Sequence, residues 1–360
     1  MAETVESARA LGRPAVLGVG EQVARDARTR VVAAAGVVLV HSTHPPGSAV
    51  LESMSPAAQG VSAAVYSLAV TFPVHAFVLL SFLNLVPRLD AGVPSAQLLR
   101  GAFGRLVPAH LFWVSVYLAV RAALEGRLPS PEQLLTGALL GTAADHLYFT
   151  PLLITLTACA ALWGWMAKRP LRAAVSALGL ALVATALRLE WGHTNPWLGA
   201  LLGPLGMGSI AVAGLWLGRA WGGVAPGPAQ VRWIVFGVGG AVLVCAVALG
   251  SAALQSGGQP LPLTGTLWLS RLGMALGVPV LLLAVPGRVP MRLIRIAPYT
   301  LGVYFLHPLS IKAVQWLEAR VPALTGMEAA LILPNAVLAA LCSLGAVVLL
   351  ARTPLRRCVI

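Results

Sequence analysis

The sequence has few charged residues: Asp, Glu, Lys and Arg make up 10% of its 360 residues, whereas apolar residues make up 58%. The mean hydropathy is +0.83. A soluble globular domain carries about 25% charged residues, so this composition excludes that class. The apolar residues form long unbroken runs rather than short alternating segments. They therefore exclude a transmembrane β-barrel and indicate helices of about 20 residues that cross a membrane.

Acidic residues are scarcer than basic ones, 12 against 25, which gives a net charge of +13. Such a balance is also typical of nucleic-acid binding. Here, however, the positive residues lie in short loops beside apolar runs, where anionic lipid headgroups account for them. We therefore expect contact with membrane lipid and no nucleic-acid partner.

Cysteine is also rare, with Cys159, Cys245, Cys342 and Cys358 as its four positions. They show no paired spacing, and three of them lie inside apolar runs. The sequence therefore indicates neither a disulfide framework nor a metal site. No internal repeat is present, and residues 1–23 lack the pattern of a secretory signal peptide.

The apolar runs predict an all-α fold, a polytopic membrane bundle of about ten transmembrane helices, each closed by Pro, Gly or charged residues. We expect one membrane domain over residues 24–351, a disordered cytoplasmic tail over 1–23 and a short cytoplasmic tail over 352–360. The predicted spans lie near residues 24–44, 61–86, 103–122, 148–167, 171–189, 197–218, 230–254, 265–285, 296–316 and 329–351.

The positive charges are distributed unequally between the two sides of these spans. Nineteen of the 25 Lys and Arg residues lie before or at the start of the first span, in the C-terminal tail, or in alternate connections and the span ends beside them. The opposite connections carry only Arg121, Arg127, Arg188 and Arg320. Because cytoplasmic loops are enriched in Lys and Arg, both termini are predicted to be cytoplasmic.

Arg30 and His41 lie in the first predicted span, separated by ten residues that are all apolar or Gly. On a helix they stand roughly 16 Å apart, so Arg30 is expected at the cytoplasmic edge and His41 beyond the middle of the membrane. An Arg at mid-bilayer costs roughly 2.5 kcal/mol or more, and polar residues kept at such a depth indicate function.

Other polar residues accompany the spans. His146 and Tyr148 open the fourth, and Tyr304 and His307 stand one turn apart in the ninth. Each has a simpler interpretation, because an intramembrane His often only bonds one helix to another.

That simpler interpretation is favoured for His75 and His110. Arg100 and Arg105, which lead into the third span, are interpreted equally well as charges that set topology or as ligand-binding groups.

An Arg, ten residues and a His in the first span resemble the acyltransferase 3 family of integral membrane acyltransferases, which acylate cell-surface sugars in bacteria. Ala27, Val31 and Tyr148 stand where that family has Asp, Gly and Trp, and Leu80-Ser81 stands where it has Ser-Gly. Four further segments are similar in the same order: residues 76–82 resemble a Phe-rich motif, 105–108 an Arg-x-x-Pro motif, 146–149 a His-Leu-Trp-Phe motif and 304–308 a Tyr-x-x-His-Pro motif.

The resemblance implies an acyl-CoA donor, expected to be acetyl-CoA, bound from the cytoplasm, and a glycan or lipid-linked sugar acceptor reached from the outer face of a bacterial inner membrane. No metal is expected. Arg30, Arg100 and Arg105 suit the phosphates of the donor, because the guanidinium fork matches phosphate oxygens. His41 and Arg30 are the expected catalytic residues. His41 would act as a general base or as an acyl carrier. His146, Tyr148, Tyr304 and His307 are then expected to bind the acceptor or orient His41.

The function predicted from the sequence is therefore transfer of an acyl group, most simply acetyl, to a hydroxyl of a surface polysaccharide or lipid-linked glycan. Two other classes stay open. A ten-span secondary transporter of metabolites or glycan precursors also has helices broken by Gly and Pro, although two matching halves are not seen here. A non-catalytic partner in glycan assembly would explain the four departures from the family pattern.

Overall fold

A computed structural model describes residues 18–44, 48–191, 196–221, 228–261, 264–285, 288–321 and 327–359. Their regular structure is α-helix and short 3-10 helix, with no β-strand, which confirms the all-α prediction. The elements are α2 (Gly18–Ser42), α3 (Ala49–Ser53), α4 (Pro56–Ala69), α5 (Pro73–Leu83), α6 (Val86–Asp90), α7 (Ser95–Glu125), α8 (Pro131–Leu140), α9 (Phe149–Ala158), α10 (Ala160–Met166), α11 (Pro170–Trp191), α12 (Pro196–Ala220), α13 (Pro228–Gln255), α14 (Gly265–Ala284), α15 (Met291–Ile296), η1 (Ala297–Tyr299), α16 (Thr300–Glu318), α17 (Glu328–Leu350) and η3 (Pro354–Cys358).

Each of the ten predicted spans falls on a helix or on an interrupted series of helices. Among the described residues, six segments are long and apolar enough to cross a membrane, or seven if α9 and α10, bent by 65°, form one span. α2, α12 and α16 fall outside this set, and in α2 and α16 the reason is polar and charged side chains such as Arg28, His307 and Lys312. The protein is thus a multi-pass membrane protein, while ten spans and cytoplasmic termini stay predictions.

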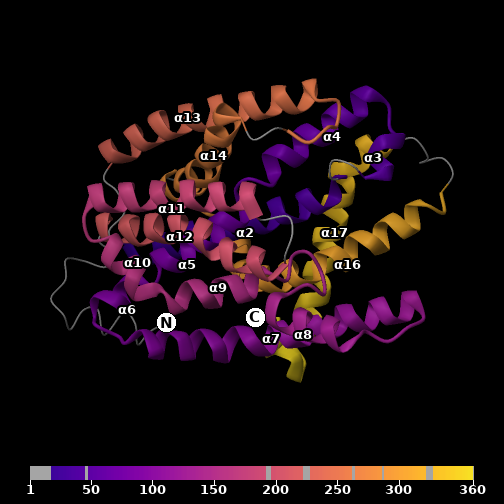
Figure 1. Ribbon diagram of the computed structural model, residues 1–360, viewed down its shortest axis with the longest axis horizontal. Helices are drawn as coiled ribbons and strands as arrows, with labels where there is room; N and C mark the ends of the chain where they lie inside the picture. Colours follow the sequence, from indigo (N-terminus) through magenta and orange to yellow (C-terminus); the bar gives the residue numbers. More distant parts are fainter. Residues whose placement is uncertain are drawn as a thin grey trace.

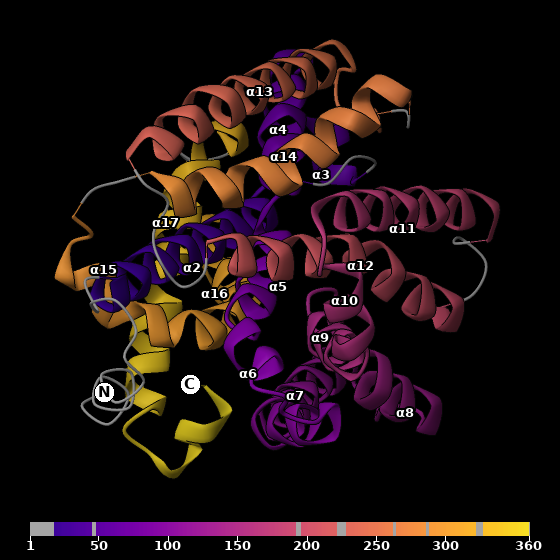
Figure 2. The ribbon, with the colours of Figure 1, turned by 90° about the vertical axis from the view of Figure 1, so that its left-hand side faces the viewer.

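Helix α2 lies at the centre of the bundle. It packs against α4, α5, α14, α15, α16 and α17, and it is surrounded by them in both ribbon views (Figures 1 and 2). Its small and β-branched residues make this possible. A Cβ at Gly36 would lie 2.8 Å from Cζ of Phe72 and 2.9 Å from Cγ of Pro73, so only Gly lets the start of α5 approach this closely. The predicted first span is therefore the central helix of the fold.

The polar N-terminal half of α2 is held by neighbouring helix ends. Asn84 Nδ2, just after α5, donates to Asp26 Oδ2 at 2.8 Å. Arg28 Nη2 donates to the carbonyls of Leu282 and Val285, the latter at 2.7 Å. The last carbonyls of a helix have no partner inside it, so Arg28 caps the C-terminal end of α14. These contacts fix α2 before its apolar part begins.

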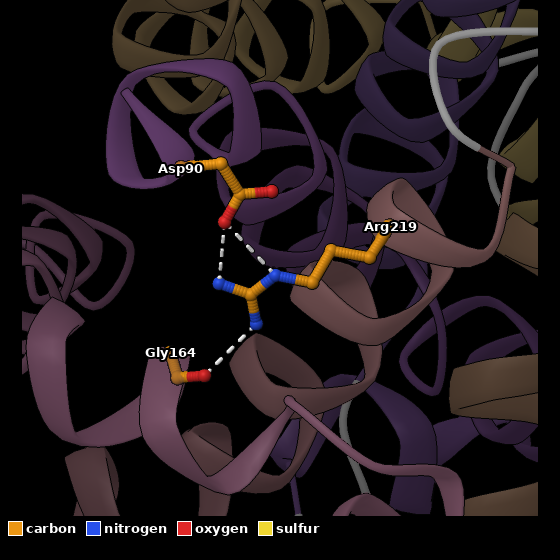
Figure 3. A network of polar contacts seen from close by, with 3 residues as sticks. All are labelled: Asp90, Gly164 and Arg219. Atoms are coloured by element: carbon orange, nitrogen blue, oxygen red, sulfur yellow. Dashed lines mark hydrogen bonds and ion pairs between the residues drawn. The ribbon is translucent and has the colours of Figure 1, made fainter. Parts of the chain in front are cut away.

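Arg219 joins three elements at the end of α12 (Figure 3). Its Nε and Nη2 donate to Asp90 Oδ1 at 3.1 and 2.8 Å, and its Nη1 donates to the Gly164 carbonyl at 2.8 Å. Asp90 is half-exposed, so solvent screens the ion pair and the main effect is positional. The guanidinium thus aligns α6, α10 and α12 at one end of the bundle.

The main apolar core is formed by α5, α7, α9, α12 and α16, with Phe82, Trp113 and Phe305 among its largest fully buried side chains. Two glycines bring α12 against α5. A Cβ at Gly214 would lie 2.6 Å from the Leu79 carbonyl oxygen, and one at Gly218 would lie 2.9 Å from that of Leu83. Small residues four positions apart are a common way for membrane helices to approach closely.

We predict that Gly214→Ala destabilises the protein, because the new methyl group collides with main chain that has no rotamer to change. Overpacking of this kind costs about 1–3 kcal/mol. Gly237→Ala is the matched control: a Cβ there meets nothing within 4 Å, and Ala favours a helix over Gly by about 1 kcal/mol. Thermal unfolding in detergent should shift down for the first variant and up or not at all for the second. Equal shifts would contradict the close contact.

Candidate active site

Three histidines from distant parts of the chain meet at one end of the bundle. His41 is in the last turn of α2, His146 precedes α9 and His307 lies in α16. The ring centroids of His41 and His307 are 4.8 Å apart, those of His146 and His307 5.3 Å, and those of His41 and His146 6.3 Å. The structure thus brings together the predicted catalytic histidine and two of the residues predicted to support it.

Pro308 explains how His307 is oriented. Proline has no N–H, so the carbonyl of Tyr304, four residues earlier in α16, has no helical partner. Nδ1 of His307 lies 2.7 Å from that carbonyl oxygen. A carbonyl only accepts, so Nδ1 carries the proton and Nε2 keeps its lone pair. The Tyr-x-x-His-Pro pattern is therefore a local device that sets the tautomer of one histidine.

The next carbonyl of the same turn holds two more side chains. Phe305 O accepts from Tyr117 Oη at 2.7 Å, and His146 Nε2 lies 3.2 Å from it. In return, Tyr304 Oη donates to the carbonyl oxygen of His146. These reciprocal bonds connect α7, the turn before α9 and α16, and they place the His146 proton on Nε2. All the side chains involved are buried.

Nε2 of His307 is buried and has no hydrogen-bond partner among the described atoms. Its residue is 0% exposed, so water does not satisfy it from the surface. A buried polar atom without a partner costs free energy, and in native structures it often marks a functional site. The His41 ring, at 4.8 Å between centroids, is close enough for the two imidazoles to share a hydrogen bond.

His41 and His146 line an open pocket of about 460 Å³. Its wall carries charges of both signs, from Arg121 and Glu125 near the end of α7, Asp145, and Lys312 in α16. Asp145 acts electrostatically on His41. A pocket of this size holds a small molecule or one end of a larger one. Its wall combines these charged side chains with apolar ones such as Leu124 and Ile311, which suits a sugar, with its hydroxyl groups and apolar ring faces.

The predicted donor-binding arginines lie on the other side of His41. Arg30 is exposed and lies roughly 16 Å along α2 from His41. Arg105, also exposed, has Arg30 and Arg88 close enough to act on it electrostatically. Three cations from α2, α6 and α7 thus gather in one region. Arg100 is exposed near the start of α7, and no described contact links it to this group.

Two other predicted residues take different positions. Tyr148 has a side chain that is 43% exposed and does not line the pocket, so its role in substrate binding stays a prediction. His110 Nε2 lies 3.0 Å from the Ala138 carbonyl, which ties α7 to α8 as expected of a structural histidine. Within the described residues, no group of three His, Cys, Asp or Glu side chains has a geometry suited to a metal ion.

Sequence reasoning assigned no role to Tyr117, Asp145 or Arg121, all of which belong to the pocket wall. The sequence contains a spacing pattern that could have identified Tyr117 and Arg121. Tyr117 and Arg121 are four residues apart on α7 and therefore share a helix face. Asp145 carried no such signal, because its approach to His41 depends on how the turn before α9 packs on α16.

We predict that diethyl pyrocarbonate, which acylates unprotonated imidazoles, modifies His41 in native membranes well before His307. His41 faces the pocket, whereas His307 is fully buried. Mass spectrometry of the two peptides over a time course measures this order. Modification in denaturing detergent is the control, in which both should react at similar rates. Equal rates in the native protein would contradict the burial of His307.

The comparison with known families agrees with this geometry. A family model described as an acyltransferase domain matches residues 29–352, nearly the whole chain and all three histidines. No curated protein and no solved structure matches the chain. The resemblance inferred from five short segments is thereby confirmed, and the chain belongs to the acyltransferase 3 family as a membrane-embedded acyltransferase.

Proposed function

We propose that the protein transfers an acyl group, most simply acetyl, from acyl-CoA to a hydroxyl of a cell-surface polysaccharide or lipid-linked glycan in a bacterial inner membrane. The observation that carries this proposal is the position of the His41–His307 pair. A polar pocket opens on one side of it, and a group of arginines lies on the other.

The arginine side suits the donor. Coenzyme A carries several phosphate charges, and guanidinium groups bind phosphate through paired, charge-assisted hydrogen bonds. Arg30 and Arg105 are exposed and therefore accessible to such a ligand. The charge distribution of the sequence predicts that this side faces the cytoplasm, where coenzyme A esters are made. Arg100 is proposed to extend the same site.

The pocket side suits the acceptor. Asp145, Glu125 and Gln315 offer oxygen acceptors for sugar hydroxyls, and Arg121 and Lys312 offer donors. This wall lies beyond His41 on the side predicted to face outward. An acceptor presented there meets His41 without crossing the bundle. Tyr304 shapes the pocket floor indirectly, by holding the main chain of His146.

The proposed chemistry follows from the tautomers. With its proton on Nδ1, His307 can accept a hydrogen bond only at Nε2, which has no partner among the described atoms. We propose that His41 donates one ring N–H to this nitrogen during the reaction and keeps its other nitrogen free. The free nitrogen takes the proton of the acceptor hydroxyl while the oxygen attacks the thioester carbonyl. The carbon–sulfur bond then breaks, and the proton on His41 neutralises the departing thiolate. A positioned general base of this kind contributes roughly 10² to 10⁴ in rate.

The test is transfer of labelled acetyl from acetyl-CoA to cell-envelope glycan in membranes that carry the wild type or a single variant. We expect His41→Gln to lower transfer by roughly 10² or more, the contribution of a general base. His110→Gln is the matched control, since it removes a buried histidine whose described bond is to α8. Its transfer should stay near the wild-type level.

If His41→Gln and the wild type transferred acetyl equally well, His41 would not be the general base. Absence of label with folded wild type would reject acetyl-CoA as donor or glycan as acceptor. Such an absence would favour other donors or a role in assembly of the glycan.

Pro308 supplies a second prediction. Pro308→Ala restores an N–H to α16, and the Tyr304 carbonyl then forms a helical bond instead of holding His307. Proline inside a helix costs about 3 kcal/mol, so the variant should be at least as stable as wild type. Transfer should fall roughly 10- to 100-fold, because small displacements of catalytic groups are costly. Thermal unfolding and labelled transfer measure the two effects separately.

Pro334→Ala is the control for this experiment. Pro334 also lies inside a helix, α17, and is exposed away from the pocket. Its replacement should stabilise the protein and leave transfer unchanged. If Pro308→Ala kept full transfer, the carbonyl of Tyr304 would not be needed to orient His307.

A further inference from the structure

A second cavity lies about one helical turn from the histidine pair and shares no lining residue with the polar pocket. It is an apolar crevice of about 100 Å³ between α2, α16 and α17, and Ile296, the last residue of α15, also lines it. Its lining includes Val38 from α2, Val303 from α16 and Ala340 from α17. None of these residues takes part in the reaction proposed above. We therefore ask which ligand the crevice could bind.

On both α2 and α16, the residues that line the crevice come one helical turn before a histidine of the pair. On α2 its lining residues include Ala34 and Val38, and His41 follows three residues after Val38, on the same face. On α16 they include Val303, and His307 follows four residues later. Both histidines therefore stand about one helical turn beyond the crevice, and their rings are 4.8 Å apart.

The lining excludes most polar ligands. Thr300 is the only polar residue among the crevice residues that the structure describes, and its hydroxyl donates to the Ala297 carbonyl at 2.8 Å. The amide groups of a pantetheine arm would lose their hydrogen bonds to water here without replacement, which is unfavourable. A saturated hydrocarbon segment loses nothing of this kind and gains from burial. The chemistry of the wall thus favours an aliphatic chain.

The size of the crevice limits that chain. An apolar cavity of about 150 Å³ accommodates benzene, a six-carbon ring. At about 100 Å³ the crevice suits a shorter segment of a few carbons. Ala34, Ala35 and Ala340 keep it open, because a larger side chain at any of them would fill it.

We propose that this crevice is the subsite for the aliphatic chain of the transferred acyl group, and that it makes short chains longer than acetyl good substrates. The inference rests on the proposed acyl-CoA donor and adds the acyl class. The thioester carbonyl carbon is trigonal, so the sulfur arm and the acyl chain leave it in different directions. With the carbonyl at His41, the chain enters the crevice while the arm continues to the arginines.

The test compares acetyl-, butyryl- and octanoyl-CoA as donors for the wild type and crevice variants. Wild type should use butyryl-CoA at least as well as acetyl-CoA, and octanoyl-CoA poorly. Ala35→Leu fills the crevice from an exposed position, so folding is not at risk. The ratio of kcat/KM for butyryl to that for acetyl should fall at least roughly tenfold, as for lost methylene contacts in an apolar pocket. Ala241→Leu, at an exposed position of α13, is the control and should keep the wild-type ratio.

A second measurement does not depend on transfer. Butyryl-CoA should raise the Tm of wild type more than acetyl-CoA does, because a ligand stabilises the state that it binds. Ala35→Leu should lose this difference. If no acyl group is transferred but the difference in Tm is present in wild type and absent in Ala35→Leu, the crevice binds acyl chains and only the proposed acceptor or reaction fails.

Three results would overturn the inference. Unchanged ratios and unchanged Tm differences in Ala35→Leu would show that the crevice is empty or filled by bilayer lipid. An equal fall for all donors, together with weaker binding of free coenzyme A, would assign the crevice to the pantetheine arm. Equal use of butyryl- and octanoyl-CoA by wild type would contradict the size limit.

Discussion

The geometry of the site depends on one missing N–H, that of Pro308. A regular helix uses its own carbonyls, and in an apolar interior a buried polar side chain then finds few acceptors. Pro308 leaves the Tyr304 carbonyl free for His307 Nδ1, and the adjoining Phe305 carbonyl receives Tyr117 and His146. The buried side chains are thus oriented by main chain, which is less mobile than side chains. Two main-chain carbonyls of α16, next to the proline, thus serve as the hydrogen-bond acceptors of the site.

The central position of α2 follows from the same constraint. A helix with several charges is a poor partner for lipid, because each exposed charge would need water. Surrounded by other helices, α2 bonds Asp26 Oδ2 to Asn84 and Arg28 Nη2 to the end of α14, while Asp26 Oδ1 and Arg28 Nε have no partner among the described atoms. His41 then lies on a helix fixed at its other end by polar contacts. Its ring is held within reach of His307 by the fold as a whole rather than by a flexible loop.

The parts of this structure that were predictable are those that depend on local pattern. Apolar runs predict helices because a membrane requires every backbone group to be bonded within its segment. Arg30, His41, His146 and His307 were identifiable because polar residues in such runs are costly. The meeting of three histidines was predicted only through family resemblance, since it depends on packing between distant helices. Asp145 was given no role for that reason. Helices α2 and α16 fall outside the apolar spans because they carry the site's polar residues.

In the proposed reaction, separation of the two cavities would let a thioester be used beside a wet pocket. Ile311, which lines the polar pocket, belongs to the same apolar cluster as Val38 and Val303, which line the crevice. This cluster is a hydrophobic partition that water crosses only at a cost. His41 and His307 lie next to this cluster, one helical turn after Val38 and Val303. In the proposed reaction, a hydroxyl bound in the pocket therefore gives its proton to His41 and attacks the acyl carbon, while the partition keeps water of the pocket out of the crevice.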